Sequence, residues 1–79
     1  MQSMKEILTD IVRAIVDHPD DVIVVEEDKG DEVTLTLSVH ADDMGMVIGR
    51  HGRIAKAIRS VMKAAGGASG KKVNVEIKD

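Results

Sequence analysis

The apolar positions follow a helical spacing at the start of the chain. Over the first 17 residues they recur every three or four positions, behind a Ser3 and Glu6 pair of the capping-box type. This pattern predicts a helix that runs to about Asp17, with an apolar side formed by Met4, Ile7, Leu8, Ile11, Val12 and Ile15. Pro19 disfavours helical backbone at His18, so we expect a turn over residues 18–21.

The spacing then changes to that of β-strands. Residues 22–25 are a β-branched run, residues 29–31 (Lys-Gly-Asp) predict a turn, and strict alternation follows at Val33, Leu35, Leu37 and Val39. Val73, Val75 and Ile77 alternate in the same way and predict a third strand. Ile23 and Val24 place apolar side chains on opposite faces of the first strand, which fits either edge packing or a subunit contact.

Two helices are expected between the second and third strands. The first covers about residues 44–48 with Asp42 or Asp43 as its cap, and the second covers about residues 53–65, ended by Gly66, Gly67 and Gly70. The second helix is amphipathic. Its expected apolar side holds Ile54, Ile58, Val61, Met62 and Ala65, and its basic side holds Lys56, Arg59 and Lys63, with Arg53 at the edge.

These elements predict an α+β fold in the order αββααβ, with three helices covering one side of a three-stranded sheet. A chain of 79 residues is expected to form a single domain over residues 1–79. The absence of Cys, Phe, Tyr and Trp excludes disulfide scaffolds, cysteine zinc sites and base stacking on aromatic side chains. Neither a signal peptide nor a membrane span is recognisable, so a cytoplasmic protein without membrane partners is expected.

Charge divides the chain into two parts of opposite sign. Residues 1–43 hold twelve acids and three bases (−9), and residues 44–79 hold two acids and eight bases (+6), which together give the net charge of −3. No Asp or Glu occurs from Met44 to Val75. A solvated helix face usually mixes both signs, so this segment favours a surface that binds an anion.

The segment Val47-Ile48-Gly49-Arg50-His51-Gly52-Arg53-Ile54 lies between the two predicted helices. Glycine permits backbone angles closed to other residues and lets a phosphate approach the main chain. The helix that follows begins with unpaired N–H groups and a partial positive charge. A sugar-phosphate backbone can therefore be clamped at this corner, although a helix–helix turn also uses glycine for steric reasons alone.

From this point the sequence resembles a known family. Residues 45–59, Gly-Met-Val-Ile-Gly-Arg-His-Gly-Arg-Ile-Ala-Lys-Ala-Ile-Arg, are similar to the signature of KH domains, specifically the small single-domain bacterial KH proteins of the KhpA family. The resemblance extends over nearly the whole chain, including residues 18–21 and the strand that begins at Lys71. It implies the type II KH arrangement, whose sheet is mixed. Met46 departs from the pattern, because the family often has Lys or Arg there, and this departure predicts one fewer phosphate contact.

The resemblance implies a protein that binds single-stranded RNA, as an RNA chaperone or post-transcriptional regulator linked to cell envelope growth and cell shape. The residues that match the RNA-binding motif are Ile48, Gly49, Arg50, His51, Gly52, Arg53 and Lys56. The resemblance also implies a homodimer and a larger KH-containing partner, KhpB. An imidazole becomes positively charged as the pH falls from about 8 to 5. Because His51 is one of these residues, we expect RNA binding to strengthen as the pH falls.

Other functions fit the sequence less well. A nucleotide-binding loop G-x-x-x-x-G-K-[ST] at Gly70 fails, because Ala65 and Lys72 stand at its first and last positions. His40, Asp42 and Asp43 could ligate a metal, but residues at a strand end more often form a helix cap, so we expect no metal or other cofactor. No Ser or Thr is placed for nucleophilic catalysis, so an enzyme is not expected. The main alternative is a protein-interaction or dimerisation module with a KH shape in which RNA binding is secondary.

Overall fold

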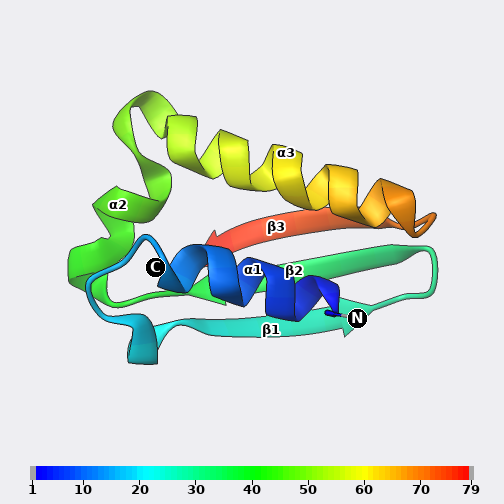
Figure 1. Ribbon diagram of the computed structural model, residues 1–79, viewed down its shortest axis with the longest axis horizontal. Helices are drawn as coiled ribbons and strands as arrows, with labels where there is room; N and C mark the ends of the chain where they lie inside the picture. Colours follow the sequence, from blue (N-terminus) through cyan, green and yellow to red (C-terminus); the bar gives the residue numbers. More distant parts are fainter. Residues whose placement is uncertain (1, 79) are drawn as a thin grey trace.

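The computed structural model describes residues 2–78 and has the predicted α+β architecture (Figure 1). In chain order the elements are α1 (Met4–Arg13), η1 (Pro19–Asp21), β1 (Ile23–Asp28), β2 (Glu32–Ser38), η2 (Ala41–Asp43), α2 (Met44–Ile48), η3 (Arg50–Gly52), α3 (Arg53–Ala68) and β3 (Lys72–Lys78). The η segments are short turns of 3-10 helix. No helix among residues 2–78 is both long enough and apolar enough to span a membrane.

The three strands form one mixed sheet in the order β1-β2-β3. β1 and β2 are antiparallel, with Val24 opposite Leu37, and β2 and β3 are parallel, with Val33 beside Val73. Parallel neighbours need a long crossover, and here α2, η3 and α3 supply it. The mixed sheet implied by the family resemblance is therefore confirmed, and the glycine-containing turn lies within the crossover.

The helices cover one face of this sheet. Along β2 the side chains alternate, with Val33, Leu35 and Leu37 buried and the intervening Thr34 and Thr36 half-buried. Figure 1 shows α1 and α3 lying against the sheet, with α3 extending alongside β3. The core is aliphatic and contains Leu8, Val12, Val16, Val22, Val24, Val33, Leu35, Leu37, Val47, Ile58, Met62, Val73 and Val75.

α1 ends at Arg13, four residues before the predicted end. Ile15, expected on the apolar side of the helix, is 37% exposed, and Val16 is buried in its place. After the helix, the N–H group of His18 donates a hydrogen bond to the carboxylate of Asp43. Pro19 reinforces this end by disfavouring helix at His18.

α3 extends to Ala68, beyond Gly66 and Gly67, which were among the glycines expected to end it. Gly66 is buried inside the helix, where an added Cβ would lie 2.3 Å from Val73 Cγ2. The glycine therefore permits a close contact between helix and strand, and this contact overrides its low helix propensity. The buried side of α3 is also rotated from the predicted one, because Ala55 is buried while Val61 is 51% exposed.

Candidate nucleic-acid interface

The turn between α2 and α3 depends on Gly49 for two separate reasons. Its φ of 74° and ψ of 173° lie in a region of backbone space that is essentially restricted to glycine. A Cβ on Gly49 would also lie 2.3 Å from Cγ1 of Ile54. Gly52 has a φ of 73° but faces open space, so only its backbone conformation favours glycine.

The residues between these glycines form a tight 3-10 turn. His51 adopts left-handed backbone angles, φ 59° and ψ 24°, which cost a non-glycine residue about 1–2 kcal/mol. The N–H of Gly52 donates to the Gly49 carbonyl at 3.2 Å, and the N–H of Arg53 donates to the Arg50 carbonyl. The turn is thus held by its own main chain, while the side chains of Arg50 and His51 are exposed.

The two long helices begin differently. At α1 a complete capping box fills the N-terminus, with the Glu6 N–H donating to Ser3 Oγ at 3.2 Å. The N-terminus of α3 has no side-chain cap and no acidic residue in its first turn, although the helix has 16 residues. Since an uncapped helix start carries partial positive charge, it attracts an anion, and the start of α3 is the one left open.

Positive side chains surround this open helix start. Arg50, His51, Arg53 and Lys56 are all exposed. Within residues 2–78, the ion pairs of Lys and Arg are Lys29–Glu27 and Lys71–Asp28, so no carboxylate lies within 4.0 Å of these side chains. The corner is therefore neither buried in the molecule nor sealed by the acidic N-terminal half.

Apolar side chains lie beside the same corner. Val47 is fully buried and fixes α2 in the core. The neighbouring Met46, Ile48 and Ile54 are each between 38% and 39% exposed. The candidate residues of the sequence motif therefore follow one another along the chain at this turn, with exposed cations at the turn and partly exposed aliphatic side chains on neighbouring residues.

Arg59 differs from the other bases of α3. The helical spacing predicted Arg59 beside Lys56 and Lys63, on the side of the helix opposite the core. In the structure its guanidinium points to β3, where Nε donates a hydrogen bond to the Val75 carbonyl at 3.2 Å. Arg59 thus connects α3 to β3 through this hydrogen bond.

A second polar cluster joins the α1–β1 connection to the start of α2. Asp43 is 1% exposed, and its carboxylate accepts hydrogen bonds from the N–H of His18 at 2.9 Å and from His18 Nδ1 at 3.1 Å. Burial alone would raise the pKa of Asp43, but hydrogen bonds from His18 and from the Asp17 N–H together lower it. The hydrogen bond with Asp43 raises the pKa of His18.

This cluster corrects one sequence-based interpretation and adds to another. His18 lies in the predicted turn, where its carbonyl accepts a hydrogen bond from the Asp21 N–H, and its ring also contacts Asp43. The sequence predicted Asp43 or Asp42 as the cap of α2. Asp43 occupies the N-cap position but makes no side-chain capping bond, because its carboxylate is used by His18. The contact joins residues 25 positions apart, and the only local signal was the clustering of His and Asp in the two connections.

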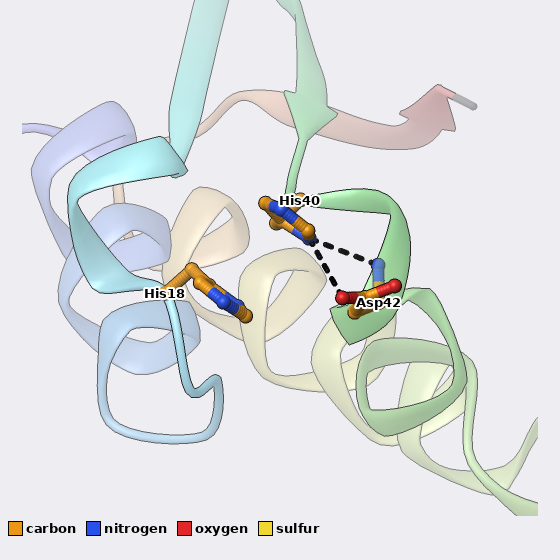
Figure 2. A group of neighbouring side chains, drawn as sticks. All are labelled: His18, His40 and Asp42. Carbon is orange, nitrogen blue, oxygen red and sulfur yellow. Dashed lines mark hydrogen bonds and ion pairs between the residues drawn. The ribbon is translucent and has the colours of Figure 1, made fainter.

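His40 completes the cluster, and Figure 2 shows it with His18 and Asp42. The rings of His18 and His40 are stacked, with centroids 4.0 Å apart and planes 14° from parallel. His40 Nδ1 accepts a hydrogen bond from the Asp42 N–H at 3.0 Å. Imidazole lone pairs lie in the ring plane, so rings stacked in this way cannot direct both lone pairs to one metal ion. As arranged, the cluster holds two segments together and does not form a metal centre.

The unit β2–α2–turn–α3–β3, with G-x-x-G between the two helices, is the arrangement that defines a KH domain, a nucleic-acid-binding module. Here α1 and β1 precede that unit, which gives the type II order.

Comparison with known proteins narrows this class to one family. The family model for the KH domain of KhpA/KhpB matches residues 5–77, and the chain belongs to this family. It is 49% identical over 78 residues to the RNA-binding protein KhpA of Bacillus subtilis, covering 99% of this chain and 96% of the relative. It is 51% identical over 76 residues to the RNA-binding protein KhpA of Halalkalibacterium halodurans, covering 96% and 100%.

Proposed function

We propose that this protein binds single-stranded RNA and holds its sugar-phosphate backbone at residues 49–52 and at the start of α3. The observation that carries this proposal is the uncapped, acid-free N-terminus of α3, surrounded by exposed cations that no carboxylate within the described residues neutralises. The relatives named RNA-binding protein KhpA support RNA as the polyanion.

Each part of the surface has a distinct task in this proposal. Gly49 and Gly52 keep the main chain bare of Cβ atoms, so that a phosphate can approach it. Arg50, His51, Arg53 and Lys56 supply positive charge to neighbouring phosphates. Ile48 and the apolar residues beside it contact bases by shape, since the chain has no Phe, Tyr or Trp for stacking.

The double variant Arg50→Asp with His51→Asp tests this proposal. Both side chains are exposed and both glycines are kept, so we expect the affinity for single-stranded RNA to fall by at least tenfold, with the melting temperature almost unchanged. Affinity is measured by fluorescence anisotropy with a labelled oligonucleotide. The control Lys5→Asp with Lys29→Asp replaces two positive charges by negative ones far from residues 49–52 and should change the affinity much less. Equal affinity for wild type and double variant would contradict the clamp.

A protein contact is the second candidate function, and it is favoured by apolar residues that no other described residue covers. Ile23 and Val25 on β1 are 59% and 61% exposed, and Val61 on α3 is 51% exposed. We propose that these apolar residues form the interface of a homodimer, because a core this small is often completed by association. A KhpB-type protein is the alternative partner for the same residues. Multi-angle light scattering of Ile23→Lys and Val61→Lys shows whether β1 or α3 forms the dimer interface. Only the variant with its substitution in the interface should become monomeric.

A further inference from the structure

The guanidinium of Arg59 is held in a fixed position at the border between α3 and β3. β3 is an edge strand, with a strand neighbour on the β2 side only within the described sheet. The hydrogen bond from Arg59 Nε to the Val75 carbonyl fixes the side chain against this edge. It is the only hydrogen bond of the Arg59 side chain with the described residues, so the two Nη groups keep their donors.

Arg59 lies too far along α3 to contact a phosphate bound at residues 49–52, and its position fits contact with a base instead. Arg59 lies six residues after the start of α3, which is about 9 Å along the helix axis at about 1.5 Å per residue. With an axial rise of about 3.4 Å per nucleotide in a stacked strand, this distance corresponds to the second or third nucleotide from the clamp. It also lies four residues after the buried Ala55, in the row of α3 that borders β3.

We propose that Arg59 is a specificity-determining residue that selects guanine within the bound RNA. With Nε held by Val75, the remaining Nη groups form a fork that matches the adjacent O6 and N7 acceptors of guanine. Adenine presents a donor at N6 beside N7, so the same fork meets one acceptor and one donor. The guanidinium plane also offers a flat surface for base stacking, in a chain that has no Phe, Tyr or Trp.

This inference rests on the proposed function, because it describes how the same RNA is read. The test uses uridine octamers that carry one guanosine, one adenosine or one 7-deazaguanosine, with binding measured by competition. Wild type should bind the guanosine octamer about tenfold more tightly than the adenosine octamer. Replacement of N7 in 7-deazaguanosine should remove most of this preference.

Arg59→Lys and Arg59→Gln separate base reading from charge. Lys keeps the positive charge without the fork, so the preference should fall to within about twofold while binding of plain octauridine is retained. Gln removes the fork and the charge together, so it should lose the same preference. The control Lys63→Gln, one turn further along α3, should weaken binding of all octamers and keep the preference.

The outcomes distinguish the two proposals. If wild type binds none of the octamers, the proposed RNA-binding function fails. If wild type binds them without a preference for guanosine, or if Arg59→Lys keeps the preference, the role of Arg59 is overturned and RNA binding stands.

Discussion

At the scale of single residues, the two glycines of the turn are not equivalent. Gly49 combines a conformation restricted to glycine with a close approach to Ile54, whereas Gly52 has left-handed angles and open space around it. We therefore expect Gly49→Ala to lower the free energy of unfolding by about 3 kcal/mol, and Gly52→Ala by only about 1 kcal/mol.

The measurement is urea unfolding of both variants, followed by circular dichroism. Gly52→Ala should stay folded and lose RNA affinity, because its new methyl group stands where a phosphate would approach. Equal losses of stability in the two variants would show that the contact between Gly49 and Ile54 does not constrain the turn.

The contact between His18 and Asp43 predicts a pH-dependent stability. Because the pKa of His18 is raised in the folded state, the contribution of His18 to the free energy of unfolding is fully present below the ordinary histidine pKa of 6.5. The contribution is lost as the pH rises through the folded-state pKa. Asp43, whose pKa is lowered, contributes above its ordinary value of 3.8 and loses this contribution on acidification.

Thermal melts of wild type and His18→Gln at pH 5.5 and pH 9 test this linkage. The difference in melting temperature should be larger at pH 5.5, where the folded protein has a charged His18 beside Asp43. His51→Gln is the control, because its side chain faces solvent and no carboxylate within residues 2–78 pairs with it. A difference that is the same at both pH values would contradict the ion pair.

Local motifs could be predicted from the sequence, but contacts between residues far apart in the chain could not. The glycine pair and its basic neighbours form one continuous segment, so their place between two helices could be predicted. Asp43 and His18 are 25 residues apart, and the clustering of His and Asp in the two connections does not indicate which of these side chains contact each other. The same limit applies to Arg59, whose orientation depends on a carbonyl of β3.

At the scale of elements, helix and strand types were predictable because their apolar periods are clear. Helix ends were less so, because α1 ends earlier and α3 continues further than local propensity indicates. The rotation of α3 also escaped prediction, since the small residues Ala55 and Gly66 give a weak apolar signal although both are buried. Packing against β3 determines that rotation.

Gly66 and Gly67 of α3 provide a matched test of this packing. Alanine in a helix interior is favoured over glycine by about 1 kcal/mol, and Gly67 has open space for a methyl group, so Gly67→Ala should stabilise the protein. At Gly66 the new Cβ would lie 2.9 Å from the Lys71 carbonyl, so Gly66→Ala should destabilise it by about 1–3 kcal/mol. Differential scanning calorimetry of both variants measures this difference, and stabilisation by both would refute the close packing.

At the scale of the whole molecule, the division of charge places the proposed RNA-binding surface in the basic half. The net charge of −3 conceals +6 over residues 44–79, and the turn and α3 belong to that half. RNA binding by two or three phosphate contacts should then depend on salt. At about 0.7 per phosphate, the slope predicts about a tenfold loss of affinity between about 50 and 200 mM salt.

A salt titration of the wild type checks this value, and Lys56→Gln should reduce the slope by about 0.7 if that side chain meets one phosphate. A slope near zero would mean that the protein holds RNA without contacting its phosphates, or that proteins are its main partners.

The hydrogen bond between His18 and Asp43 joins the two ends of the segment that contains β1 and β2. The chain therefore enters and leaves this hairpin at one fastened point, while the turn at residues 29–31 lies at the opposite end. We therefore expect that residues can be added or removed at that turn without shifting α2, so that the tip of the hairpin can vary while the proposed RNA-binding residues keep their place.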